Sequence, residues 1–180
     1  RRPPRSTLFP YTPLFRSYDG ATGGGAARIH WTGTGFTVDS GFEDHPVTYV
    51  SWYGATAFAE YYDWQLPTEW QWQAVADDDG SYTYGCGTTI DNSKANYLGS
   101  VHPDGTTAVG AFGLYGYGMA DMAGNVLEWT SSCYYTNCDG GYRVFRGGSW
   151  AGNDNHCVVS NRYSYTPDSL YGSNGFRVCR

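Results

Sequence analysis

Cysteine and histidine could carry metal or redox chemistry in this chain, but their spacing supports little of it. The four histidines show no His-x-x-x-His arrangement, and no Cys-x-x-Cys pair lies beside them. A zinc or copper site built on histidine is therefore weakly supported. Among the five cysteines, Cys133 and Cys138 flank a short turn and either close a local disulfide or stay free thiols. Ser149 has no base near it in the sequence and is better interpreted as scaffold.

Recognition is a second kind of chemistry, and residues 151–173 favour it. They show neither the period of a helix nor that of a strand, which is typical of a loop on a scaffold. They are dense in Tyr, Asn, Ser and Gly, the mixture that antibody loops use for amphipathic, adaptable contacts. The alternative is an ordinary polar surface loop. We expect a ligand to contact Ala151, Gly152, Asn153, Asn155, His156, Val158, Tyr163, Ser164, Tyr165, Asp168, Leu170, Tyr171, Gly172 and Ser173.

Two stretches with strand character bracket this segment and must position it. Val144, Phe145 and Trp150 alternate with polar or small residues, as in a half-buried strand. Phe176 and Val178 do the same after the segment. The expected arrangement is a loop carried between two strands.

Two helices are predicted in the first half of the chain. Ser51 is a suitable N-cap for a helix over about residues 52–62, which has apolar residues at helical spacing. Thr68 and Gln71 form a capping box for a second helix over about 69–76.

Other segments are expected to be strands or irregular structure. Residues 29–31 and 36–38 read as short strands. Trp70 and Trp72 are expected in the core, because large aromatic side chains are more often buried than exposed. Beyond Asp77 no helix is predicted, and so long an irregular stretch needs other means of stabilisation.

Ordered motifs over about residues 28–180 give the chain a family resemblance. They resemble the formylglycine-generating enzyme (sulfatase-modifying factor) family, whose C-type-lectin-like α+β fold implies two helices on small antiparallel sheets with much irregular loop. The motifs that carry the resemblance are His45-Pro46-Val47, Val50-Ser51-Trp52, Leu66-Pro67-Thr68-Glu69, Trp72, Gly116-Tyr117-Gly118, Asp121-Met122-Ala123-Gly124-Asn125-Val126, Glu128-Trp129, Arg146-Gly147-Gly148-Ser149-Trp150, Cys157, Asn161-Arg162, Thr166-Pro167-Asp168 and Gly175-Phe176-Arg177.

This fold serves both enzymes and non-catalytic binders, so the site must decide the function. The resemblance implies that the enzymes oxidise a substrate cysteine with two cysteines of the last segment, which fall here on Gly152 and Cys157. The pair is therefore broken, although two thiolates are what copper(I) prefers. An oxidoreductase with copper is the alternative function, with Cys157 as its one catalytic candidate.

Other members resemble the variable proteins of diversity-generating retroelements, in which adenines of the corresponding codons are randomised. Codons randomised in this way cannot encode Lys, Glu, Gln, Met or Trp. Residues 1–150 contain seventeen residues of these five types and residues 151–180 contain none. If residues 151–180 had the same frequency of these five types as residues 1–150, a stretch of this length without any of them would arise by chance in roughly 3% of cases. This resemblance implies a binding protein whose partner is a protein or glycan on another cell or particle.

Calcium is the cofactor that the resemblance implies, in a structural role. Hard cations take carboxylate and carbonyl oxygens, which loops supply freely. One ion is expected at Asn96 and Asp104, and a second at the carbonyls of Asp121, Gly124 and Val126 with the carboxylate of Glu128. The alternative for this second segment is a surface turn that binds nothing.

Length and charge limit the remaining possibilities. Residues 1–17 resemble a translated sequencing adapter or a disordered tail, and residues 18–180 fit one domain. Residues 1–17 hold four arginines and no acid, so without them the net charge falls from −6 to −6 − 4 = −10. A domain this acidic is a poor nucleic-acid binder, and no apolar run spans a membrane. The sequence does not determine the compartment. A binding protein of this kind implies a location on a bacterial or phage surface, or secretion.

Overall fold

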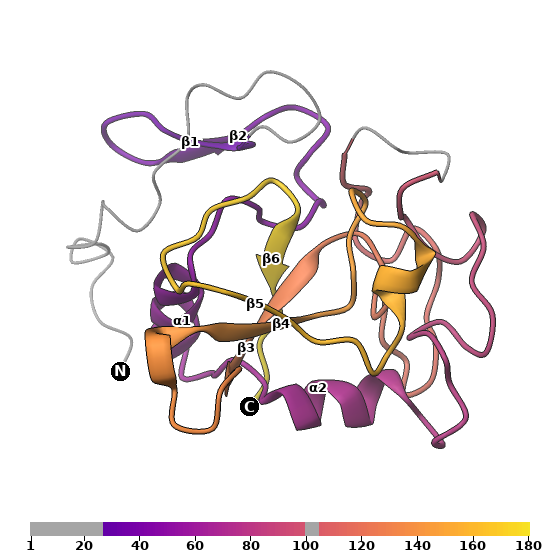
Figure 1. Ribbon diagram of the computed structural model, residues 1–180. Coiled ribbons are helices and arrows are strands. Elements are labelled where there is room, and N and C mark those ends of the chain that lie inside the picture. The colour runs from indigo at the N-terminus through magenta and orange to yellow at the C-terminus, as the bar shows by residue number, and fades with distance from the viewer. Residues whose placement is uncertain (1–26, 100–104) are drawn as a thin grey trace.

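The chain folds around one small sheet, with one helix to its left and a second helix below it in the view of Figure 1. The computed structural model describes residues 27–99 and 105–180. The sequence-based interpretation of residues 1–17 and the expected calcium ligand Asp104 lie outside these described residues. Within them no helix is long and apolar enough to cross a membrane.

Both predicted helices are confirmed with their caps. Helix α1 spans Trp52–Tyr61, and the Ser51 side chain accepts a hydrogen bond from the Gly54 amide at 3.1 Å. Helix α2 spans Glu69–Ala76, with the Thr68 and Gln71 side chains each bonded to the other's backbone. These bonds satisfy amides that the first helical turn leaves without partners, which fixes where each helix begins.

The central sheet has four strands in the order β5-β4-β3-β6. Strand β4 is antiparallel to both of its neighbours, whereas β6 is parallel to β3. The half-buried alternation expected around Val144 is wrong, because Val144, Phe145 and Arg146 are all fully buried. A strand in the middle of a covered sheet is buried on both faces. The bounds are Leu127–Cys133 for β3, Arg143–Arg146 for β4, Tyr163–Tyr165 for β5 and Asn174–Phe176 for β6.

Tryptophans of the sheet and of α2 anchor the core. Trp129 of β3 stacks on Phe145 of β4 with ring centroids 3.6 Å apart, and Trp72 of α2 is buried against Met122. The expectation for Trp72 is confirmed. Trp70 is instead 66% exposed, because it lies on the solvent side of α2. A base rate for aromatic burial could not distinguish the two faces of so short a helix.

The irregular stretch between α2 and β3 holds no further α-helix in its described part. Hydrogen bonds of buried asparagines hold this stretch together. The Asn96 carbonyl accepts from the Asn125 amide at 2.8 Å, and the Asn125 side chain exchanges two hydrogen bonds with the Thr107 backbone. Gly124 has φ +75, and a side chain there would overlap the Asn96 carbonyl. Hydrogen bonds between separate loop segments thus replace the regular ladders of a sheet.

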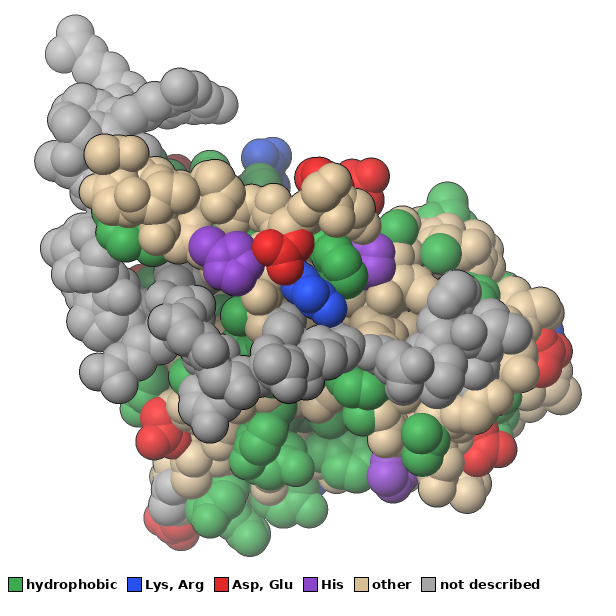
Figure 2. Space-filling view, turned by 90° about the horizontal axis from the view of Figure 1, so that it is seen from above, with side chains coloured by type: hydrophobic (Ala, Val, Ile, Leu, Met, Phe, Trp, Pro, Cys, Tyr) green, Lys and Arg blue, Asp and Glu red, His purple; other side chains and the backbone are tan. Residues whose placement is uncertain are grey.

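The two short strands expected near the start of the chain are confirmed as a hairpin. Strands β1 (Ile29–Trp31) and β2 (Phe36–Val38) pair antiparallel at the top of the view in Figure 1. Asp39 makes an ion pair with Arg28 and a hydrogen bond with His30 on this hairpin. Figure 2 shows basic, acidic and histidine side chains gathered on this face, seen from above.

Candidate binding surface

Cys157, the catalytic candidate of the enzyme alternative, is packed in the interior. It ends the 3-10 turn Asp154–Cys157 and has no solvent exposure. Burial raises the pKa of its thiol to about 12. A Cβ on Gly148 would lie 2.6 Å from the Cys157 sulfur, so backbone closely covers the thiol. Because the thiolate is the reactive and metal-binding form, this cysteine is poorly suited to either role.

The partner that the enzyme alternative requires for Cys157 is missing at the matching position. Gly152 stands at the first position of the pair and is itself buried, and a Cβ there would lie 2.6 Å from Nδ1 of His156. Cys86 belongs to the same apolar cluster as Cys157, and burial raises the pKa of its thiol to about 11. No group of three or more His, Cys, Asp or Glu side chains in the described ranges could hold a metal ion. The residues present do not fit a copper site.

The predicted contact residues differ in how far their side chains are exposed to solvent. Seven of them are exposed: Ala151, Asn153, Asn155, His156, Tyr165, Asp168 and Tyr171. Val158, Tyr163, Ser164, Leu170, Gly172 and Ser173 are partly buried, and Gly152 is buried. The structure therefore places polar and aromatic side chains of this segment outward while its one cysteine faces inward.

Two tyrosines form a pair on this outward side. Tyr165, at the end of the edge strand β5, and Tyr171 are 39% and 46% exposed, with ring centroids 5.1 Å apart. Tyr165 also lies edge-on against buried Phe145 at 5.7 Å, and the Tyr171 carbonyl accepts from the Tyr49 amide at 3.1 Å. Both rings are thus held in place while much of their surface stays open to a partner.

Tyr163 differs from these two. It packs against the core cluster of Trp129 and Phe145, and burial raises the pKa of its phenol. Its ring lies 5.4 Å from that of His156. Tyr163 therefore supports the surface from below, and the segment that sequence periodicity treated as loop contains a real strand, β5.

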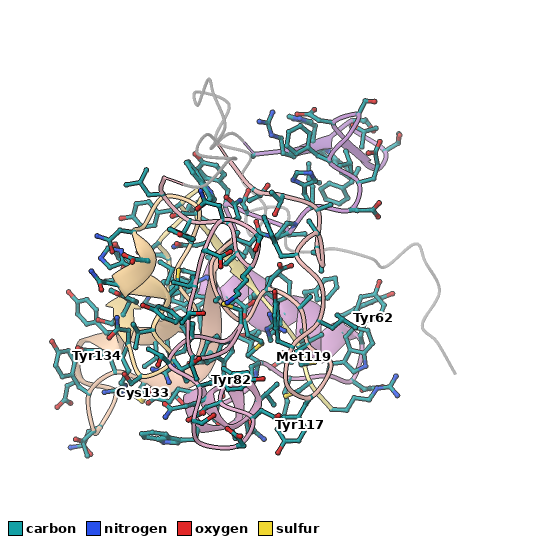
Figure 3. All side chains as sticks on the ribbon, turned by 90° about the vertical axis from the view of Figure 1, so that its right-hand side faces the viewer. Tyr62, Tyr82, Tyr117, Met119, Cys133 and Tyr134 are labelled. Carbon is teal, nitrogen blue, oxygen red and sulfur yellow. A yellow bond between two sulfur atoms is a disulfide. The ribbon has the colours of Figure 1, made fainter. Side chains whose placement is uncertain are left out.

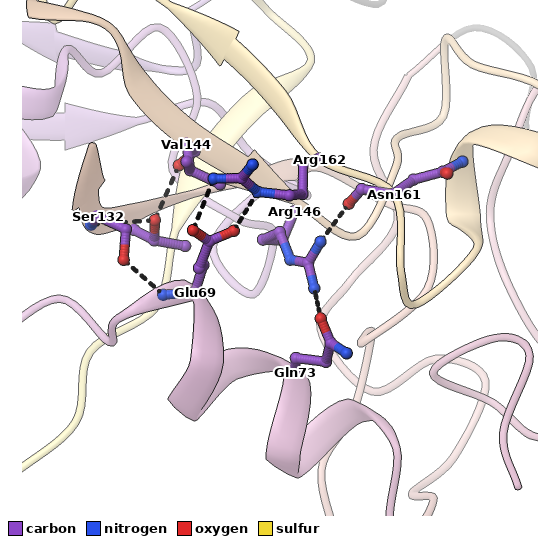
Figure 4. Close-up of polar contacts among 8 residues, drawn as sticks. Glu69, Gln73, Ser132, Val144, Arg146, Asn161 and Arg162 are labelled. Carbon is purple, nitrogen blue, oxygen red and sulfur yellow. Dashed lines mark hydrogen bonds and ion pairs between the residues drawn. The ribbon is translucent and has the colours of Figure 1, made fainter. Parts of the chain in front are cut away.

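Two arginines tie the segment to α2 and β4 (Figure 4). Arg162 makes a bidentate pair with buried Glu69, at 2.5 Å and 2.8 Å. These hydrogen bonds raise the pKa of Arg162. Arg146 is fully buried, donates to the Asn161 carbonyl at 2.6 Å and also bonds the Gln73 side chain. Sequence reasoning assigned no role to these residues, although Arg146 opens the Arg-Gly-Gly-Ser-Trp motif.

Three residues of the expected calcium sites have side chains that are hydrogen-bonded within the protein. Both oxygens of buried Glu128 pair with Arg177, at 2.5 Å and 2.6 Å, and Oε2 also accepts from the Trp72 indole at 2.6 Å. The Asp121 carboxylate accepts from the Gly110 amide at 2.9 Å, and burial raises its pKa. The Asn96 side chain donates to the Gly105 carbonyl at 2.9 Å.

Gly124 and Val126 lie buried just before β3. Since Arg177 already neutralises Glu128, that carboxylate does not fit a calcium ion in this arrangement. Calcium binding stays a prediction, which a variant of Glu128 can test.

Two helices against a small mixed sheet, with a long irregular half, define a C-type-lectin-like α+β domain. A solved structure of this fold, Treponema denticola variable protein 1, aligns with a TM-score of 0.68 over 86% of this chain and 77% of that chain, at 23% identity. Residues 22–180 match the family model of the sulfatase-modifying factor enzyme 1-like domain. The chain belongs to this family.

The curated relatives of this chain are longer proteins, and their names describe different kinds of protein. The serine/threonine-protein kinase pkn1 of Chlamydia pneumoniae is 31% identical over 170 aligned residues, which cover 86% of this chain and 27% of the kinase. The inactive C-alpha-formylglycine-generating enzyme 2 of Bos taurus is 35% identical over 150 residues, covering 74% of this chain and 50% of that protein. The chain thus spans about a quarter and a half of the lengths of these two relatives.

Proposed function

We propose that this domain is a non-catalytic ligand-binding module that displays residues 151–173 as its contact surface. One observation carries the proposal: the segment exposes two tyrosines, two asparagines and a histidine (Tyr165, Tyr171, Asn153, Asn155 and His156), while Cys157, its only thiol before Cys179, is fully buried. Tyrosine supplies large contact area at low entropic cost, and interface hot spots are enriched in it.

Composition and fold both support this function. The absence of Lys, Glu, Gln, Met and Trp from residues 151–180 agrees with diversification of their codons at adenines. A variable protein is among the solved structures that share the fold. A protein or glycan on another cell or particle is the partner class that we propose.

The alternative, oxidation of a substrate cysteine, makes a direct test possible. The purified domain is incubated with copper(I), oxygen and a cysteine-bearing sulfatase peptide, and the peptide is examined by mass spectrometry. We expect the peptide cysteine to stay unmodified, because Gly152 leaves Cys157 without a second thiolate. Conversion of that cysteine to formylglycine by the wild-type domain would overturn the proposal.

A further inference from the structure

A second group of tyrosines lies outside the segment that sequence analysis singled out. Tyr135 and Tyr142, in the connection between β3 and β4, are 52% and 37% exposed, and their ring centroids are 5.9 Å apart. Tyr135 also contacts Tyr134 edge-on at 5.1 Å. These side chains take no part in the core clusters of the described residues.

The connection that carries these tyrosines is cross-linked at two points. A disulfide joins Cys133 to Cys138 and encloses Tyr134 and Tyr135. The Tyr134 amide donates to the Tyr142 carbonyl at 3.0 Å, which ties the two sides of the connection together. A contact surface that is ordered before binding loses less entropy when a partner arrives.

The connection adjoins the predicted binding segment at two points. The Arg162 guanidinium lies 4.9 Å from the centroid of the Tyr134 ring. The 3-10 turn Asp139–Gly141 approaches Pro167, since a Cβ on Gly141 would lie 3.9 Å from the Pro167 ring. The exposed tyrosines of the connection and the pair Tyr165 and Tyr171 therefore lie on either side of this contact.

The free charges at this junction are negative. Asp139 and Asp168 are exposed, and neither takes part in the ion pairs found in the described part of the chain. The neighbouring cations are engaged: Arg162 pairs with Glu69, and Arg143 lies 4.1 Å over the Trp52 ring.

We propose that the β3–β4 connection is a fixed half of the binding surface, next to residues 151–173, and that the whole surface takes a protein segment bearing arginine or lysine. This inference rests on the proposed function. Guanidinium and ammonium groups stack on tyrosine faces and pair with carboxylates. With residues 18–180 at a net charge of −10, the domain as a whole also favours a basic partner.

A random peptide display library is the probe. It is selected on the wild-type domain, and each enriched peptide is measured against three double variants: Tyr165→Ser with Tyr171→Ser, Tyr135→Ser with Tyr142→Ser, and the control Tyr62→Ser with Tyr117→Ser. The control tyrosines are also exposed, at 49% and 66%. Tyr134 and Tyr62 lie at opposite edges of the molecule in Figure 3, so Tyr62 is remote from the proposed surface.

We expect peptides rich in arginine and lysine whose affinity falls at least tenfold in each of the first two variants and stays unchanged in the control. Replacing Asp139 and Asp168 by Asn should weaken the same peptides. Peptides that need Tyr165 and Tyr171 but are neutral or acidic, or ignore Tyr135 and Tyr142, would overturn this inference and leave the proposed function intact. If no enriched peptide needs Tyr165 and Tyr171, both proposals fail. A cooperative melting transition above the assay temperature confirms that each variant is folded.

Discussion

The buried ion pair between Glu128 and Arg177 gives the sharpest prediction of the structure. Replacing Glu128 by Gln keeps the size and one carbonyl oxygen, which still accepts from the Trp72 indole, but removes the charge that faces the guanidinium. Breaking one side of a buried pair costs about 3–5 kcal/mol. The Arg177 side chain retains 20% exposure, so water partly compensates and the lower end applies. A loss of about 3 kcal/mol corresponds to a fall in Tm of roughly 6–12 °C for a domain of this size.

Urea unfolding of the wild type and of Glu128→Gln measures this loss directly. The matched control is Asp39→Asn, which breaks the ion pair with Arg28, where the two side chains are 38% and 27% exposed. We expect that change to cost less than about 1 kcal/mol, because water screens exposed pairs.

The same two proteins decide the role of calcium. If Arg177 is the partner of Glu128, the loss is equal in EDTA and in millimolar calcium, and the wild-type melting temperature is indifferent to the chelator. A loss below about 1 kcal/mol in both conditions would refute the ion-pair reasoning. A loss seen only in calcium would also restore Glu128 as a calcium ligand.

Three further predictions concern the thiols, the irregular half and the tyrosines. Burial raises the pKa of the Cys157 thiol from its ordinary value of 9.0 to about 12, so above pH 9 the unfolded chain loses a proton that the folded chain keeps. The contribution of this thiol to stability should be constant below pH 8 and fall by up to about 1.4 kcal/mol per pH unit between pH 9 and 11. Because burial also raises the pKa of Cys86, the measurement is the difference in slope between the wild type and Cys157→Ala, and equal slopes would contradict this prediction. Gly124→Ala combines a positive φ with an overlap at a buried carbonyl, so we expect little soluble folded protein, and a wild-type Tm would show that the local backbone is wrong. Tyr163→Ser removes core contacts and should lose about 3 kcal/mol in urea unfolding, whereas Tyr165→Ser with Tyr171→Ser should lose less than half as much; equal losses would place all three tyrosines in the core.

Local signals in the sequence were sufficient for much of the fold. Ser51 and Thr68 mark helix starts because a cap depends only on residues within one turn. Strand β5 escaped prediction because Tyr163 and Tyr165 have polar neighbours on a three-residue edge strand, too short to show a period.

The side-chain pairs of the site could not be predicted from local patterns. Glu69 and Arg162 are separated by 93 positions, and Glu128 and Arg177 by 49. A pairing of this kind depends on how the sheet brings distant segments together. Motif resemblance marked Glu128 as a calcium ligand, but nothing local to it showed that the Arg177 guanidinium would pair with its carboxylate.

The central claim is that residues 151–173 are a diversified contact surface, and the gene itself tests it most directly. The measurement is to sequence the DNA beside the coding region and search for a near-copy of the stretch that encodes residues 151–177, together with a reverse-transcriptase gene. We predict a copy that differs only at adenines, with the differing codons falling on exposed positions such as Asn153, Asn155, Tyr165 and Tyr171. An intact locus with no such copy would contradict the claim and leave Gly152 and Cys157 as fixed residues.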